Sequence, residues 1–188
     1  MMLVSYMAKY IIGPKWDERI IRITQRGKVG IIMSGGIDSY VLFHLLKNPI
    51  IFNIKRADGF DTADRVRRLT GQEVIEIEEV STEHNKRVWY TSNKIIEDYN
   101  LDQLYNGSNM IPPIQFFPEF AEGYASRPWE EHEVIMPFRM IYKYHVISLA
   151  NNLSIDLSDT MSCISRTDNP CGKCWHCRER EWGFKHAD

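Results

Sequence analysis

The chain has 188 residues, of which 44% are hydrophobic and 26% are charged. That length suits one α/β domain with a sizeable core and a small appendage, and it is too short for two full domains. The formal net charge of −2 gives no electrostatic reason to expect nucleic acid as a partner.

Neither a targeting segment nor a membrane span is expected. The N-terminus lacks a basic leader followed by a sustained apolar region, and no run reaches the roughly 18 apolar residues of a spanning helix. We therefore expect a cytoplasmic protein with no membrane partner. In that reducing compartment the four cysteines should be thiols or metal ligands rather than disulfides.

The first 27 residues contain one candidate element, a short helix over Asp17–Ile23 that Gly27 would end. A strand is predicted next, over Val29–Met33, because this run is apolar without alternation, as in strands buried on both faces. Glycines interrupt the run before a helix over Tyr40–Leu46. The pattern therefore predicts a strand, a tight turn and a helix.

The turn between them reads Ser-Gly-Gly-x-Asp-Ser. Glycines let the backbone take positive φ and approach a ligand closely. Amide N–H groups at a helix start lack internal partners and favour an anion, so the turn is typical of a phosphate site. The alternative is an ordinary strand-to-helix turn in which Ser39 or Asp38 caps the helix. No lysine follows in the Walker position, which excludes the P-loop of kinases and GTPases. The predicted phosphate-binding residues are Ser34, Gly35, Gly36, Ile37, Asp38 and Ser39.

Strands then alternate with helices along the chain, which predicts a Rossmann-like parallel sheet with helices on both faces. Ligands of such sheets sit beyond the carboxyl ends of the strands, where both Ser34 and Gly107 fall. The expected elements are strands over Ile50–Ile54, Glu73–Ile77 and Gln103–Asn106, a helix from the cap Asp61 to Leu69 that Gly71 ends, and a helix over Glu83–Tyr99.

Prolines and aromatic residues share the segment Met110–Met136, so no regular element is expected there. So long a connection is typical of a lid or binding loop, and its aromatic residues suit a flat heterocycle. A structural loop that fills the core or a subunit interface is the alternative. A helix is predicted from Met136-Pro137 onward, with Met140, Tyr144 and Ile147 facing inward. Its cations Arg139 and Lys143 could reach a phosphate or stay solvated.

The second motif is Cys163-x7-Cys171-x2-Cys174-x2-Cys177. Such spacing lets four thiolates surround one ion, which would be structural because no coordination position stays open. Zinc is favoured, an iron–sulfur cluster is a rival, and four unrelated buried cysteines are a further alternative. His176 is interpreted as a bystander. We expect one domain over residues 1–158 and a cysteine module over residues 159–188.

The turn at Ser34–Ser39 resembles the pyrophosphate loop of N-type ATP pyrophosphatases, which have an adenine nucleotide alpha hydrolase-like fold. The tail resembles the 7-cyano-7-deazaguanine synthase family of that group. It shares the family's threonine-x-serine-cysteine step and its cysteine-glycine-x-cysteine-x-x-cysteine run, followed by an arginine and a glycine-phenylalanine pair. The matching residues are Gly107, the Pro118-Glu119-Phe120 triplet, Lys143, Thr160, Ser162 and the tail from Cys163 to Phe184.

The resemblance implies an ATP-dependent ligase that adenylates 7-carboxy-7-deazaguanine and uses ammonia to form the nitrile. It implies ATP, Mg²⁺ and structural Zn²⁺ as cofactors, and a homodimer. Asp38 and Lys143 would be catalytic, Gly107 would contact ATP, and Phe116, Glu119 and Phe120 would contact the substrate.

The chain departs from the family pattern over Lys55–Gly59 and Met110–Phe117. Two alternatives therefore stay open. One is another ATP pyrophosphatase with a different acceptor, either an amide-forming ligase or a tRNA-modifying enzyme. The other is a non-catalytic nucleotide-binding relative.

Overall fold

A five-stranded parallel sheet organises the computed structural model, which describes residues 4–55, 61–79, 84–118, 134–164 and 169–187. The strand order is β5-β4-β3-β6-β7, and every neighbouring pair is parallel. In chain order, the strands of this sheet and the helices around it are β3 (Val29–Ile32), α1 (Ile37–Leu45), β4 (Ile50–Lys55), α2 (Ala63–Thr70), β5 (Val74–Glu78), α3 (His84–Tyr99), β6 (Gln103–Asn106), β7 (Val134–Ile135), α4 (Lys143–Asn152) and α5 (Trp175–His186).

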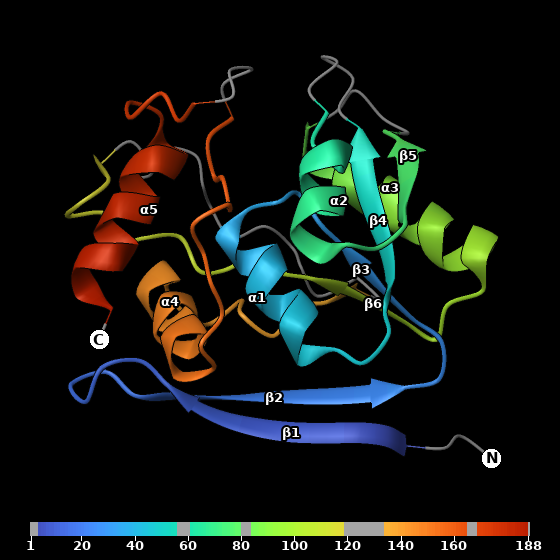
Figure 1. The fold of residues 1–188 in the computed structure, drawn as a ribbon, viewed down its shortest axis with the longest axis horizontal. Helices are drawn as coiled ribbons and strands as arrows, with labels where there is room; N and C mark the ends of the chain where they lie inside the picture. The colour runs from blue at the N-terminus through green and yellow to red at the C-terminus, as the bar shows by residue number, and fades with distance from the viewer. Residues whose placement is uncertain (1–3, 56–60, 80–83, 119–133, 165–168, 188) are drawn as a thin grey trace.

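Helices cover both faces of the sheet, as predicted. Successive strand residues point to opposite faces, and Ile31 joins a core with α1, α2 and α4, whereas Ile32 packs into a second core with α3. Both faces are therefore apolar, which explains why β3 reads as an unbroken apolar run. Figure 1 shows α3 behind the sheet and α1 and α4 side by side in front of it.

The predicted helix over Asp17–Ile23 is wrong. The N-terminal segment is an antiparallel hairpin of β1 (Val4–Ile12) and β2 (Arg19–Arg26), which lies below α1 and α4 in Figure 1. Ile21 and Ile23 are buried beneath these helices, whereas Ile20 points outward and is 50% exposed. Because apolar side chains occupy both faces of this strand, its sequence lacks the alternation that would have indicated a strand.

The helix predicted from Met136-Pro137 begins later than expected. A short strand, β7, precedes it, and turns separate that strand from α4, which starts at Lys143. Tyr144 and Ile147 are buried as predicted, but Met140 lies before the helix and is 71% exposed. Lys143 therefore occupies the first turn of a helix, not its middle.

The other predicted elements are present within a few residues of their expected bounds. The Asp61 carboxylate accepts a hydrogen bond of 2.8 Å from the Ala63 N–H, and Gly71 ends α2 in the left-handed conformation. Within the described part of the chain, no helix combines the length and the apolar character needed to cross a membrane.

Candidate active site and cysteine centre

The phosphate-loop residues and Gly107 meet at one edge of the sheet. Ile32 and Asn106 pair in register at the carboxyl ends of β3 and β6, so the segments that follow them are neighbours. A Cβ at Gly107 would stand 2.7 Å from the Asp38 carbonyl carbon and 2.8 Å from the Ser39 nitrogen. Only glycine lets the segment after β6 touch the start of α1.

The loop itself is closed by Ser39 and by the C-terminal segment. The Ser39 hydroxyl donates to the Gly36 carbonyl at 3.2 Å and accepts from the Ser34 N–H at 3.3 Å. The Met161 N–H donates to the Gly35 carbonyl at 2.9 Å. Gly36 is the N-cap of α1, and no side chain caps the helix there. The Ser34 N–H thus has a hydrogen-bond partner within the loop, whereas no side chain accepts a hydrogen bond from the amides at the start of α1.

Two neighbours of the loop were not anticipated from the sequence. Gly35 takes a φ of 74°, and a Cβ on it would stand 2.8 Å from Cδ of Arg65 in α2. Asn53 in β4 is buried and donates to the Met33 carbonyl at 2.8 Å and to the Thr62 hydroxyl at 2.7 Å. These contacts fix the chain on both sides of the loop.

The predicted pair Asp38 and Lys143 is brought together by α1 and α4. The Lys143 ammonium donates to Asp38 Oδ2 and lies 3.3 Å from Glu179 Oε2. The side chains of Lys143 and Glu179 are 4% and 3% exposed, and that of Asp38 is 20% exposed. Asn109 donates to Glu179 Oε1 at 2.9 Å. One buried cation therefore faces two carboxylates.

Sequence reasoning missed Glu179 as a site residue. Glu179 and Gly183 are four residues apart and so share one face of α5, and both are buried. A Cβ at Gly183 would stand 2.6 Å from Lys143 Cγ, so this glycine lets α5 approach the lysine stem. The sequence carried no direct signal for Glu179, because its burial depends on how α5 packs against Lys143 of α4.

The electrostatics of this group favour a charged lysine. Burial is the largest influence on the pKa of Lys143 and lowers it, but Asp38 and Glu179 together outweigh burial, so the pKa is raised. Burial raises the pKa of Glu179, and Lys143 opposes this only in part. Lys143 is therefore an ammonium at neutral pH.

Three buried oxygens beside the loop lack a hydrogen-bond partner among the described residues, Asp38 Oδ1, Asn53 Oδ1 and Ser162 Oγ. Unpartnered buried oxygens are costly, so they indicate a group that binds there. A carboxylate oxygen next to a phosphate loop suits Mg²⁺, which prefers oxygen ligands and is held in proteins by one or two carboxylates together with phosphates. Asp38 Oδ1 is therefore a suitable ligand for Mg²⁺.

The four cysteines converge as predicted. Their Sγ atoms all lie within 4.8 Å of one another, and Cys174 Sγ is 3.9 Å from Cys163 Sγ and 3.5 Å from Cys177 Sγ. Tetrahedral thiolates at the zinc–sulfur distance stand about 3.8 Å apart. The separations therefore fit a single zinc ion, whereas an iron–sulfur cluster would hold its thiolates further apart.

Backbone amides donate hydrogen bonds to two of the cysteine sulfurs at this centre. The Cys171 N–H donates to Cys163 Sγ at 3.3 Å, and the Cys174 N–H donates to Cys171 Sγ at 3.4 Å. Hydrogen bonds from the Cys174 and Lys173 amides lower the pKa of Cys171 to about 6. Gly172 takes a φ of 68°, which supplies the turn between the ligands.

The predicted substrate residues are only partly described. Phe116 is 49% exposed, and its ring lies 6.0 Å from the Trp182 ring of α5. Phe117 is buried and meets Trp182 edge to face. Glu119 and Phe120 lie outside the described residues. The aromatic rings of Phe116 and Phe117 thus contact α5, and of the two only Phe117 is buried.

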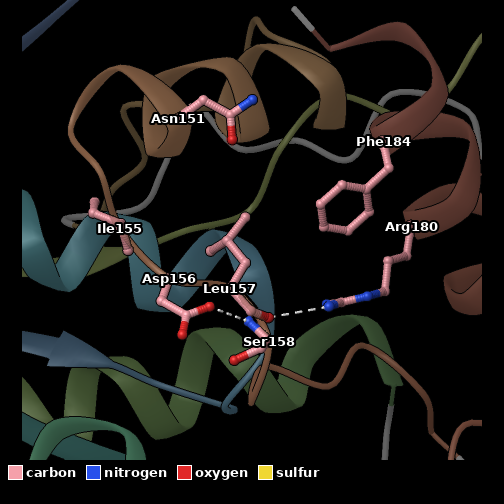
Figure 2. A pocket seen from close by; sticks show the side chains of 7 residues that line it. All are labelled: Asn151, Ile155, Asp156, Leu157, Ser158, Arg180 and Phe184. Carbon is pink, nitrogen blue, oxygen red and sulfur yellow. Dashed lines mark hydrogen bonds between the residues drawn. The ribbon is translucent and has the colours of Figure 1, made fainter.

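A cavity of about 320 Å³ lies between α5 and the end of α4 with the segment that follows it (Figure 2). Arg180 reaches across it from α5 and donates to the Leu157 carbonyl at 3.2 Å and to Thr160 Oγ1 at 2.8 Å. No residue predicted for ATP, substrate or metal binding lines it. Its lining consists of Asn151, Ile155, Asp156, Leu157, Ser158, Arg180 and Phe184.

Comparison with known proteins matches residues 114–188 to the family model described as Queuosine biosynthesis protein QueC. A 7-cyano-7-deazaguanine synthase of Polynucleobacter asymbioticus is 39% identical over 54 residues, which cover 28% of this chain and 22% of the relative. One of Campylobacter hominis is 38% identical over 56 residues, which cover 30% and 26%. A 7-cyano-7-deazaguanine synthase 2 of Sulfurisphaera tokodaii is 28% identical over 100 residues, which cover 48% and 22%.

These matches confirm the resemblance to the 7-cyano-7-deazaguanine synthase family that the motifs indicated. In each of these relatives the matched part is about a quarter of the protein or less.

Proposed function

We propose that this protein is an ATP-dependent ligase that converts 7-carboxy-7-deazaguanine and ammonia to 7-cyano-7-deazaguanine, with release of AMP and pyrophosphate. The names of the relatives support the pathway, and the family-model match over residues 114–188 includes the cysteine tail. One observation carries the chemistry: a buried ammonium, Lys143, lies against Asp38 in the first turn of the helix that follows the Ser-Gly-Gly loop.

The reaction needs two adenylations, and its atoms balance without water. A carboxylate oxygen attacks the α-phosphorus of ATP, and pyrophosphate leaves. Ammonia then attacks the acyl carbon, and AMP departs with that oxygen to leave an amide. The amide oxygen attacks a second ATP, and loss of the second AMP with protons yields the nitrile. Each carboxylate oxygen therefore ends in one AMP.

The protein's task is to stabilise charge at the phosphates, not to supply a nucleophile. The start of α1 and the Lys143 ammonium provide preorganised positive charge for the attacked α-phosphate and the leaving pyrophosphate. Asp38 would hold Mg²⁺ through its unpartnered oxygen, and the ion would neutralise phosphate charge when bound. We assign the cysteine centre to one structural Zn²⁺ that holds the start of α5.

Incubation of the protein with Mg-ATP, ammonia and 7-carboxy-7-deazaguanine tests the proposal, with products read by mass spectrometry. We expect both amide and nitrile, each absent without ATP. Asp38→Ala should retain the fold and lose product formation. Asp98→Ala, which removes an exposed carboxylate that pairs with Lys94 on α3, should retain activity.

Amide without nitrile would indicate a ligase that stops after one adenylation. If Mg-ATP binds and neither product forms, the acceptor assignment fails. The residues over Lys55–Gly59 and Met110–Phe117, which depart from the family pattern, would then serve a different acceptor or a non-catalytic role.

A further inference from the structure

Glu179 is the least expected member of the Lys143 group, because it comes from α5 and not from the sheet edge. It lies two residues after Cys177, in the helix that begins at the cysteine centre. Its carboxylate is 3% exposed. Both of its oxygens are engaged, Oε1 by the Asn109 amide at 2.9 Å and Oε2 by Lys143 at 3.3 Å. Glu179 thus connects the cysteine helix to the proposed phosphate site.

Asp38 and Glu179 hold Lys143 in different ways. Asp38 is 20% exposed and keeps one oxygen without a partner among the described residues, so it can exchange Lys143 for a ligand at the loop. Glu179 has no such freedom, since a change of partner would leave a buried carboxylate unpaired. Close packing at Gly183 also fixes the distance between α5 and the lysine stem.

We infer that Glu179 is a positioning residue of the proposed ligase, which keeps the Lys143 ammonium aimed at the phosphate loop when Asp38 turns to bound Mg-ATP. The inference rests on the proposed function for its catalytic consequence. Its structural part, that Glu179 immobilises Lys143, holds for the protein without ligand. The cysteine centre would then support catalysis through α5, without touching substrate.

Glu179→Gln isolates the charge from the packing. Glutamine has nearly the same shape, and its carbonyl oxygen can still accept from Asn109, which leaves its NH2 group, a donor, facing the Lys143 ammonium in place of a carboxylate oxygen. Glu181→Gln is the matched control, because Glu181 lies in the same helix and is exposed. Both variants can be compared with the parent protein by thermal unfolding, to confirm that each is folded.

The first readout needs neither substrate nor turnover. A buried ammonium held by two carboxylates exchanges its protons slowly, so ¹⁵N-lysine labelling should give a resolved Nζ–H signal, assigned by its loss in Lys143→Met. We expect Glu179→Gln to broaden or lose this signal and Glu181→Gln to keep it. A signal unchanged in Glu179→Gln would overturn the immobilising role.

The second readout is steady-state turnover with 7-carboxy-7-deazaguanine, ammonia and Mg-ATP. Misplacement of a catalytic group by about 1 Å can cost roughly 100-fold in rate, so Glu179→Gln should lower kcat by about 10- to 100-fold. The KM for ATP should change by less than about threefold, because the phosphate loop is intact.

The two readouts separate the two hypotheses. If the parent protein binds Mg-ATP without turnover and Glu179→Gln still loses the Nζ–H signal, the proposed function fails and the immobilising role stands. If the parent is active and Glu179→Gln keeps its kcat, the positioning role fails and the proposed function stands. A variant that loses only thermal stability would show a structural role and would equally overturn the inference.

Discussion

The two halves of the candidate site are held by different means. The phosphate loop is fixed by glycines and short-range hydrogen bonds, such as those of Ser39 to Ser34 and Gly36. The Lys143 half depends on contacts between α1, α4 and α5, which lie far apart in the sequence. The first half is therefore set by backbone geometry, including the contacts that Gly107 and the Met161 N–H make with it, whereas the second depends on side-chain contacts and on how well the cysteine helix is anchored. Substitutions in the two halves should therefore impair the protein differently, in ATP binding for the loop and in turnover for the Lys143 half.

The largest effect should come from Lys143→Met, which removes the ammonium that the proposed function places against the phosphates. One preorganised electrostatic group is worth about 100- to 1,000-fold in kcat, and we expect a loss of that size. Lys94→Met is the control, since Lys94 pairs with Asp98 at 2.6 Å on an exposed surface. Pyrophosphate release measures both. Equal turnover in the two variants would remove Lys143 from the mechanism.

Loss of the metal should act on the Lys143 half through α5. Cys174→Ser removes a ligand that also stands at the N-cap of α5. Because metal binding contributes to folding free energy, bound zinc should fall from about one ion per chain and thermal stability should fall with it. Elemental analysis and thermal unfolding measure this. Visible absorbance and iron in anaerobically purified protein would instead indicate an iron–sulfur cluster.

Gly107→Ala should damage the loop half. The added Cβ would meet backbone atoms of Asp38 and Ser39 at 2.7 to 2.8 Å, and backbone cannot move aside as a side chain can. Overpacking of this kind costs about 1–3 kcal/mol, so we expect reduced stability and weaker Mg-ATP binding. Denaturant unfolding and calorimetric titration measure the two effects. Normal ATP affinity would show that the loop does not depend on this contact.

Gly183→Ala should have the smallest effect and should leave ATP binding unchanged. Its Cβ would meet Lys143 Cγ at 2.6 Å and Ile147 Cδ1 at 2.9 Å, which are side-chain atoms able to shift. Alanine gains about 1 kcal/mol of helix propensity over glycine, which offsets part of the clash. Since small misplacements reduce rate, kcat should fall by several-fold to about tenfold. An unchanged kcat would mean that α5 does not set the position of Lys143.

The same division explains what the sequence could predict. The strand-turn-helix at the loop, the parallel sheet and the cysteine centre follow from short motifs and local periodicity, so the structure agrees with them. Glu179 could not be placed, because its role depends on α5 packing against α4 through Gly183. The hairpin was misread because Ile20 is apolar and exposed, which hid the alternation of β2.

The division between residues 1–158 and 159–188 and the roles of the individual site residues remain predictions. Contacts across that division tie the two parts closely, as in the pairing of Arg180 with the Leu157 carbonyl and with Thr160. The expected lid over Met110–Met136 is described only at its ends, so its stacking role is also still a prediction.

Transfer of substrate oxygen to AMP tests the central claim most directly. 7-Carboxy-7-deazaguanine labelled with ¹⁸O in its carboxylate is incubated with the protein, Mg-ATP and ammonia, and the AMP is analysed by mass spectrometry. Adenylation of the carboxylate and then of the amide predicts one ¹⁸O in each AMP and none in pyrophosphate. Unlabelled AMP, or label in pyrophosphate, would contradict attack at the α-phosphorus and with it the proposed ligase.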